Sequence, residues 1–241
     1  MQHIGKTRDK LRLLWDLFLD YIFPKECFGC QKEGEYLCSA CFDKINYIDE
    51  SICYLCHKKK QAKGICLDCQ KKYGIDEILV ITNYNENIVA QLVEELKYSF
   101  IEGVAEVLAR VIDHKLRQTD QTSFLYNKIL VPIPLHVKRF KERGFNQTSR
   151  IILFLQDKYN FKMDENLILR KKYTNQQAKL NRQERLSNVK DCFIFNLKRE
   201  IPSEVVLFDD VLTTGATFIE ATKILKSYGV KKICCLAVCH G

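Results

Sequence analysis

One stretch, Val205 to Thr217 with the sequence VVLFDDVLTTGAT, sets the strongest limit on how this chain folds. It begins with four apolar residues, 205–208, a pattern typical of a strand buried on both faces. Two acids and a Thr/Gly-rich turn follow, and residues 219–228 then have helical spacing. Open α/β sheets bind ligands at the carboxyl ends of such strands. We therefore predict an α/β fold with a ligand site at this strand end.

The turn after this strand carries groups that bind a phosphate. Hydroxyls and closely spaced backbone N–H groups at a helix N-terminus form a site for a dianion. The residues that supply them are Thr213, Thr214, Gly215, Ala216 and Thr217. Asp209 and Asp210 repel a phosphate, so we expect them to bind vicinal sugar hydroxyls of the same ligand. The pattern predicts a ribose 5-phosphate derivative, and a plain strand, turn and capped helix is the alternative.

The stretch closely resembles the 5-phosphoribosyl-1-pyrophosphate (PRPP) signature of type I phosphoribosyltransferases. This resemblance implies the type I phosphoribosyltransferase fold, a mostly parallel central sheet flanked by helices. It also implies PRPP as ligand, Mg²⁺ bound with it, and Asp209 and Asp210 as the catalytic residues. Further blocks, quoted below, narrow the resemblance to the ComF family of competence proteins.

Eight of the twelve cysteines form four CxxC pairs. The pairs are Cys27 and Cys30, Cys38 and Cys41, Cys53 and Cys56, and Cys66 and Cys69. Four thiolates make a closed tetrahedral zinc site, so these pairs predict two structural Zn²⁺ ions. Sequential pairing is favoured because the short gaps can close as hairpins and because it resembles the double zinc ribbon of ComF proteins, whereas alternate pairing would give a cross-braced fold. We expect chelation to unfold the N-terminal third alone.

Length and composition set the domain plan. A chain of 241 residues with 46% hydrophobic content can bury one substantial core and a small appendage. We predict an apolar N-terminal helix at 1–24, a double zinc ribbon at 25–72 and a phosphoribosyltransferase-like domain at 73–241. The chain shows neither a membrane-spanning apolar run nor a signal-peptide pattern, which predicts a cytoplasmic protein. The net charge of +8 favours phosphate-bearing partners.

Residues 10–23, KLRLLWDLFLDYIF, form a candidate helix that is apolar on most of its circumference. Such a helix must bury its sides. It either packs on the protein's own core or a second subunit, or lies on a membrane surface and makes the protein peripheral to the inner membrane.

A basic segment follows the predicted strand 129–134. The residues His136 to Gln147, HVKRFKERGFNQ, resemble the ComF "PIPLH…RGFNQ" block, which has the position of the pyrophosphate loop in phosphoribosyltransferases. Lys138, Arg139 and Arg143 are therefore expected to bind pyrophosphate. A solvated start of a basic helix is the alternative. The tripeptide Leu96-Lys97-Tyr98 also resembles the LKY of ComF proteins.

The polar stretch from Lys171 to Asn188 resembles the ComF "T.sQ..L…eR..N" pattern. In type I phosphoribosyltransferases the corresponding segment is a mobile flap that closes over PRPP and excludes water. The residues placed over the ligand are Thr174, Gln177, Arg182 and Arg185. A helix packed on the surface is the alternative.

The ComF resemblance implies a role in natural transformation, with single-stranded DNA and the DNA-uptake machinery as partners. DNA would contact the zinc ribbons and the loop from Lys138 to Arg143, with Tyr54 and Tyr73 as aromatics on which bases stack. The alternative is a cytoplasmic phosphoribosyltransferase that moves ribose 5-phosphate from PRPP to a nucleobase or amine. No residue pattern names an acceptor, so the sequence leaves catalysis open.

Overall fold

The computed structural model describes residues 24–48, 52–58, 64–84, 87–98, 101–173 and 188–241. Two compact units make up the chain, Met1–Lys44 and Ile45–Gly241. The division falls between the second and third CxxC pairs, and the predicted domain boundaries at 24/25 and 72/73 stay predictions. The candidate helix at 10–23 and the four flap residues lie outside the described residues.

The smaller unit holds the first two CxxC pairs on short elements. A bridge between Glu26 and Glu33 closes the first pair into a hairpin-like turn. The second pair brackets the start of helix α2 (Ser39–Phe42), whose N-cap is Cys38. Each CxxC turn therefore presents its two sulfurs from one end of a tight backbone loop.

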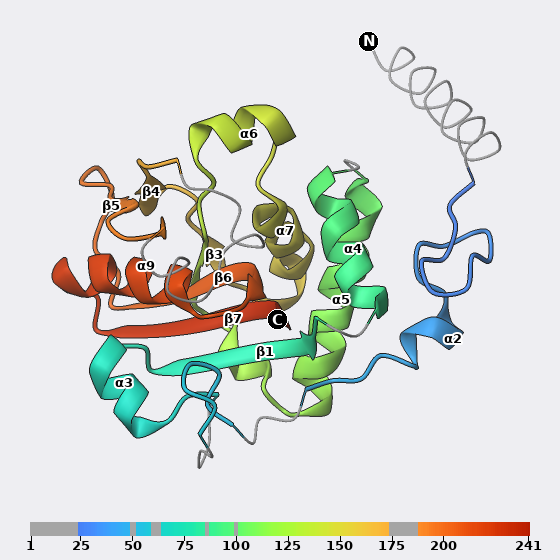
Figure 1. Cartoon of the computed structure of the whole chain (residues 1–241), viewed down its shortest axis with the longest axis horizontal. Helices are drawn as coiled ribbons and strands as arrows, with labels where there is room; N and C mark the ends of the chain where they lie inside the picture. The colour runs from blue at the N-terminus through green and yellow to red at the C-terminus, as the bar shows by residue number, and fades with distance from the viewer. Residues whose placement is uncertain (1–23, 49–51, 59–63, 85–86, 99–100, 174–187) are drawn as a thin grey trace, which may run out of the picture. The chain divides into compact units, whose positions relative to one another are not determined.

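The larger unit is built on a five-stranded sheet with the order β1-β7-β6-β2-β3 (Figure 1). The strands are β1 (Glu77–Asn83), β2 (Ile129–Pro132), β3 (Lys162–Met163), β6 (Glu204–Leu212) and β7 (Lys232–His240). All four neighbouring pairs of this sheet run parallel. The α/β class with a mostly parallel sheet is thus confirmed.

The acid-bearing strand is longer than its apolar run suggests. β6 continues to Leu212, and Asp209 pairs in register with Ala237 of β7. Asp209 and Asp210 are therefore residues of the strand itself and not of the turn after it.

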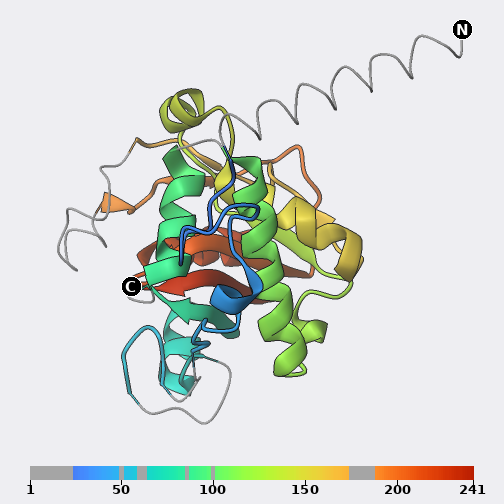
Figure 2. The same ribbon diagram turned by 90° about the vertical axis from the view of Figure 1, so that its right-hand side faces the viewer.

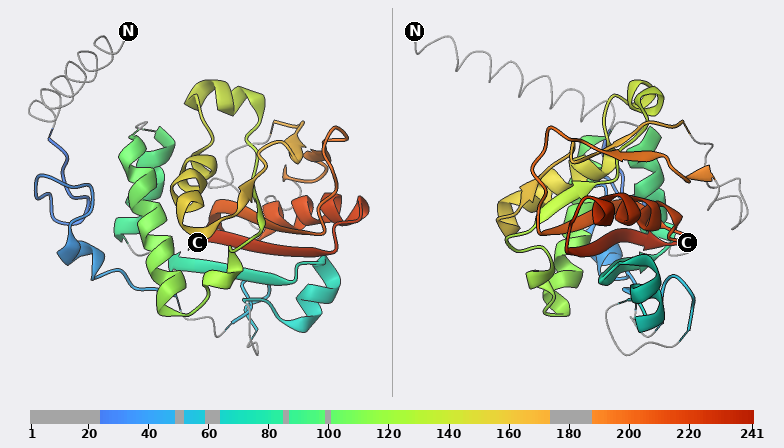
Figure 3. Two further views of the ribbon diagram at one scale, coloured as in Figure 1. Left: turned by 180° about the vertical axis from the view of Figure 1, so that it is seen from behind. Right: turned by 90° about the vertical axis from the view of Figure 1, so that its left-hand side faces the viewer.

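Helices cover both faces of the sheet (Figures 2 and 3). Three of them, α4 (Asn87–Tyr98), α5 (Glu102–Gln118) and α7 (Gln147–Tyr159), pack together on one face. The other face carries α9 (Ala216–Ser227), beside which α3 (Leu67–Tyr73) packs. Among the described helices, none is both long and apolar enough to cross a bilayer.

Smaller elements complete the larger unit. The 3-10 turn η1 (Thr122–Phe124) precedes β2, and the short helix α6 (Val137–Arg143) follows β2. An antiparallel pair, β4 (Ile168–Arg170) and β5 (Phe193–Phe195), brackets the predicted flap segment and packs on α9. The Phe195 ring stacks on Tyr228 with 4.6 Å between centroids.

The third and fourth CxxC pairs are part of the larger unit's core. Cys53, Tyr54 and Leu55 pack in one buried cluster with Phe218 and Leu225 of α9. The expectation that chelation unfolds the N-terminal third alone stays a prediction. A second expectation needs correction. Tyr54, at 1% exposed, cannot stack on a DNA base.

Candidate functional site

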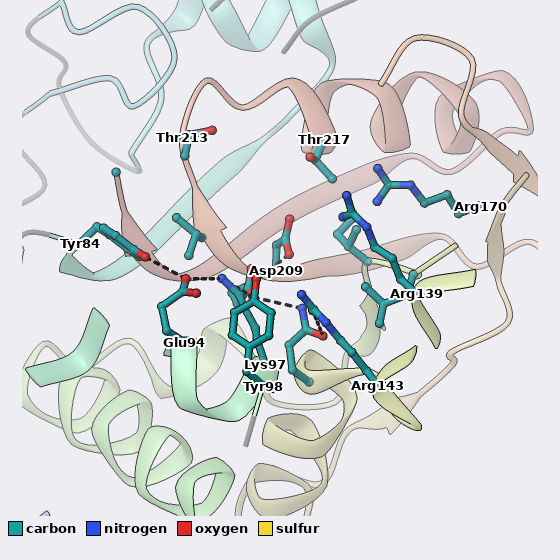
Figure 4. Close-up of a pocket in the computed structure, with 16 residues that line it drawn as sticks. Tyr84, Glu94, Lys97, Tyr98, Arg139, Arg143, Arg170, Asp209, Thr213 and Thr217 are labelled. Atoms are coloured by element: carbon teal, nitrogen blue, oxygen red, sulfur yellow. Dashed lines mark hydrogen bonds and ion pairs between the residues drawn. The ribbon is translucent and has the colours of Figure 1, made fainter. Parts of the chain in front are cut away.

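A pocket of about 400 Å³ lies at the carboxyl end of the sheet (Figure 4). It is bordered by residues at or just past the ends of β1, β2, β6 and β7, where open parallel sheets bind ligands. The predicted site residues that line it are Arg139, Arg143, Asp209, Asp210, Thr213 and Thr217. Lys138, Thr214, Gly215 and Ala216 are not among its lining residues.

The two adjacent acids have different surroundings. Asp210 is 8% exposed, and its Oδ2 lies 3.3 Å from Lys97 Nζ. The same oxygen accepts a hydrogen bond of 3.1 Å from Gln147 Nε2. Asp209 contributes Oδ1, which accepts a 3.0 Å hydrogen bond from the Asp210 backbone N–H. Asp210 is thus held by Lys97 and Gln147, and both acids line the pocket.

The different surroundings of Asp209 and Asp210 shift the pKa values of the two carboxyl groups in opposite directions. Burial raises the pKa of Asp209 well above its usual range, and the negative charge of Asp210 raises it further. Burial would also raise the pKa of Asp210, but Lys97 and the Gln147 amide outweigh it and lower that pKa. Two neighbouring acids whose environments push their pKa values apart are typical of sites where one carboxyl holds a proton and the other stays ionised.

Lys97 is held in turn by Glu94 of the same helix, which also contacts Tyr84 just after β1. Its Nζ lies 3.0 Å from Glu94 Oε1, and the same oxygen accepts a 2.8 Å hydrogen bond from the Tyr84 hydroxyl. Burial alone would lower the pKa of Lys97, but Asp210 and Glu94 together raise it. The residue therefore stays charged and delivers one positive charge to the acid pair. The sequence reasoning left Lys97 out of the site, although the LKY tripeptide pointed to it.

The turn between β6 and α9 has the geometry of an anion-binding loop. Gly215, with φ +76°, is the N-cap of α9. Thr214 Oγ1 accepts a 3.4 Å hydrogen bond from the Ala216 N–H. Thr213 and Thr217 stand at the pocket on the α9 side (Figure 4). The backbone N–H groups at the start of a helix make this end electropositive.

Three arginines also line the pocket (Figure 4). Arg139 and Arg143 are four residues apart on α6 and so share one helix face. Arg143 donates to Gln147 Oε1 at 3.1 Å and lies over the Tyr98 ring at 5.4 Å. Arg170, at the end of β4, is a third lining arginine that the sequence reasoning missed.

The start of the basic block has a structural role. His136 Nδ1 accepts a 3.2 Å hydrogen bond from the Lys138 N–H and caps α6. Asn146 caps α7 through the Thr148 N–H, and its own amide donates to Ile133 O at 2.9 Å. Asn146 therefore fixes α7 to the end of β2, which aims the next residue, Gln147, at Asp210.

The eight CxxC cysteines gather into two groups of four. The first group is Cys27, Cys30, Cys38 and Cys41, and the second group is Cys53, Cys56, Cys66 and Cys69. Within each group all sulfurs lie within 4.8 Å of one another, and none is in a disulfide. The Sγ atoms of Cys30 and Cys38, and those of Cys56 and Cys66, are 3.6 Å apart. Zn–S bonds of about 2.3 Å require sulfurs roughly 3.8 Å apart, so both groups fit structural zinc.

Comparison with known proteins agrees with this arrangement. The Double zinc ribbon domain family matches residues 18–72. Competence protein F of Haemophilus influenzae is 29% identical over 212 residues, which cover 86% of each chain. Competence protein ComFC of Streptococcus pneumoniae is 28% identical over 84% of this chain and 87% of its own length.

A third relative has a different name. DNA utilization protein YhgH of Escherichia coli K12 is 26% identical over 230 residues, covering 90% of this chain and 97% of its own. All three alignments cover most of the chain. The chain is a homologue of these competence and DNA utilization proteins over most of its length, with a double zinc ribbon at its N-terminal end.

Proposed function

We propose that this chain binds PRPP in the pocket at the carboxyl end of the sheet and acts in DNA uptake. One observation carries the PRPP part. Asp209 lines a pocket that also has the threonines of the α9 turn and the arginines of α6 on its walls. PRPP has a 5-phosphate, a ribose diol and a pyrophosphate, and each of these finds a complementary group there.

The residues that line the pocket indicate where each of the three parts of PRPP would bind. The 5-phosphate would sit on the N–H groups and hydroxyls of the turn at the start of α9. The pyrophosphate would bind Arg139 and Arg143, because guanidinium forks match phosphate oxygens. The ribose diol would then contact Asp209. Mg²⁺ accompanying PRPP would be held by phosphate oxygens with a carboxylate of the acid pair.

The names of the relatives support the DNA part, and one exposed feature fits it. Tyr173 is 43% exposed, and its ring centroid lies 5.0 Å from Lys138 Nζ. Arg139 lies 5.8 Å and the His136 ring 5.3 Å from the same centroid. An exposed aromatic ring surrounded by positive charge can stack on a base and contact its phosphates.

The alternative, a phosphoribosyltransferase, has support in the shape of the pocket. Beyond the acid pair, Tyr84, Glu94 and Tyr98 line a part of the pocket that the PRPP groups above do not use. A nucleobase or amine bound there could attack C1 of the ribose. Its nitrogen lone pair would form the C1–N bond, pyrophosphate would leave with the electrons of the C1–O bond, and the nitrogen would lose a proton.

PRPP binding is tested by calorimetric titration in the presence of Mg²⁺. Asp209→Asn removes the acid that faces the pocket but leaves the Asp210–Lys97 pair in place. We expect at least about a hundredfold weaker binding with near-normal folding. Glu200→Gln, at an exposed position, is the control. Equal affinity of wild type and Asp209→Asn would contradict the proposal, and pyrophosphate release with added bases would favour the transferase.

DNA binding is tested by fluorescence anisotropy with a single-stranded oligonucleotide. We expect binding to weaken with salt by a slope of about 0.7 per phosphate contact. Tyr173→Ala should weaken it about tenfold, whereas Tyr126→Ala, a similarly exposed tyrosine at the other end of β2, should not. No binding at low salt would remove the DNA part and leave the small-molecule transferase as the better account.

A further inference from the structure

The second four-cysteine group packs directly against the turn between β6 and α9. Leu55, between Cys53 and Cys56, is 4% exposed. A Cβ atom added to Gly215 would lie only 2.2 Å from Leu55 Cδ2. The leucine methyl group therefore fills the space that a side chain at Gly215 would need. The contact is at the residue where the backbone, at φ +76°, enters the helix.

The neighbouring residue joins the same group to a second border of the pocket. The Tyr54 ring lies 5.2 Å from that of His240, the last residue of β7. Gly241 follows, lines the pocket, and donates its N–H to Leu212 O at 2.9 Å. Leu212 is the residue at which β6 ends and the turn begins. Two adjacent residues of one CxxC loop thus contact both chain segments that frame the turn.

This cysteine loop is itself anchored on the sheet. A Cβ atom at Gly64 would lie 1.8 Å from Ile78 O of β1, so the loop backbone rests directly on the strand. Gly64 O in turn accepts a 3.1 Å hydrogen bond from the Tyr54 N–H. One ion bound by four thiolates would hold the loop in this shape. Without it the four close sulfurs lose the bonds that keep them together.

We propose that the second four-cysteine group positions the Thr213–Thr217 turn through Leu55, so that metal retention at this group and anion binding at the turn are coupled. Leu55 is a positioning residue, since it touches the turn and not the ligand. The coupling must be reciprocal, because a ligand that orders the turn also stabilises the metal-bound loop by the same factor. The anion-binding half rests on the proposed function, whereas the order of the turn does not.

The first test needs no ligand. Amide hydrogen exchange of residues 212–218 is measured on the metal-loaded full chain, relative to the amides of β1, which share the same core. Leu55→Ala should speed exchange of the turn about tenfold. Leu225→Ala is the matched control, a fully buried leucine of the same cluster near the end of α9. Leu55→Met should restore slow exchange, because it nearly conserves side-chain volume.

The same measurement links the turn to the metal. A chelator should speed exchange of the turn in wild type but add little in Leu55→Ala, where the direct contact between the cysteine loop and Gly215 is already lost. Equal exchange of the turn in Leu55→Ala and Leu225→Ala would overturn the inference, as would a chelator effect that does not depend on Leu55.

A second test changes the contact between Leu55 and Gly215 and measures the affinity for PRPP. Gly215→Ala should abolish measurable binding, because its methyl group meets Leu55. The double variant Leu55→Ala, Gly215→Ala should regain at least about tenfold in affinity, since backbone strain at this φ is the same in both proteins. A double variant as weak as Gly215→Ala would overturn the contact. Wild type that fails to bind PRPP would contradict the proposed function, and hydrogen exchange would still decide the inference.

Discussion

The two four-cysteine groups have the same ligands and different structural settings. The first lies in the smaller unit, and Phe28 and Gly29, between its first two cysteines, are half-buried and exposed. The second lies in the larger unit, and the matching residues, Tyr54 and Leu55, are 1% and 4% exposed. The residues of a metal-binding loop can therefore stay exposed, as in the first group, or pack into a large hydrophobic core, as in the second.

The residues between the ligands decide which of the two occurs. A tyrosine and a leucine bring large apolar areas that gain from burial, at about 25 cal/mol per Å². Glycine at the matching place brings none. Ile65, next to Cys66, is also buried in the larger core. The second group is thus a zinc site by its cysteines and a core segment by its neighbours.

Removal of one ligand from each group should give the largest difference. Cys53→Ser is expected to lose its metal and to lower the free energy of unfolding of the larger unit by at least about 4 kcal/mol. Cys27→Ser should leave the unfolding transition of the larger unit within about 0.5 kcal/mol of wild type. Urea unfolding followed by circular dichroism, with metal content from elemental analysis, gives both values. Equal destabilisation by the two variants would contradict the division into units.

The two groups can also be compared with all eight cysteines intact, by truncating the residue that follows the first cysteine of each group. Tyr54→Ala removes a fully buried aromatic ring and should lower the free energy of unfolding by about 3 kcal/mol. Phe28→Ala, at the matching position of the first group, should cost less than about 1 kcal/mol because its ring is only half-buried. The same unfolding experiment measures both. A larger loss for Phe28→Ala would show that the exposure of these positions does not govern their role.

PRPP should protect only one of the two metals. If the second group and the α9 turn are coupled, saturating PRPP should slow capture of the second metal by a chelator about tenfold. The first metal should leave at the same rate with and without PRPP. Chelator absorbance resolves the two phases, and Cys27→Ser, which retains only the second group, assigns them. Equal protection of both metals, or of neither, would count against the coupling.

Much of the fold follows from local patterns. The apolar runs at 129–134 and 205–208 correctly located β2 and β6, because strands buried on both faces need continuous apolar sequence. The end of β6 was set too early, since two acids in a row do not resemble a strand. The hydrogen-bond ladder with β7 continues through them and overrides that local pattern.

The site was only half predictable. Arg139 and Arg143 share a helix face and both line the pocket, but Lys138, also predicted there, is rotated about 100° from Arg139 on α6 and lies at Tyr173. Helical periodicity could have excluded it. Lys97 and Gln147 reach Asp210 from other helices, and only tertiary packing brings them together.

The smallest effect is expected at the end of β6 away from the pocket, at a site that neither four-cysteine group contacts through the ion pairs of Glu204. Glu204 Oε1 lies 2.7 Å from Lys128 Nζ and 2.8 Å from Lys232 Nζ. Burial would raise the pKa of Glu204, but hydrogen bonds from the two ammonium groups outweigh it and lower that pKa. Because the folded pKa is below the unfolded one, the stabilisation is complete above the unfolded value near 4.5 and is lost as pH falls through the folded value.

Glu204→Gln should therefore lower the free energy of unfolding by less than about 1 kcal/mol at pH 7. The difference from wild type should stay constant down to about pH 4.5 and shrink only below it. Any loss of stability common to both proteins between pH 7 and pH 5 then belongs to groups other than this carboxylate. Urea unfolding of both proteins across this range measures the difference between them. A difference that already shrinks above pH 5 would contradict the lowered pKa of Glu204.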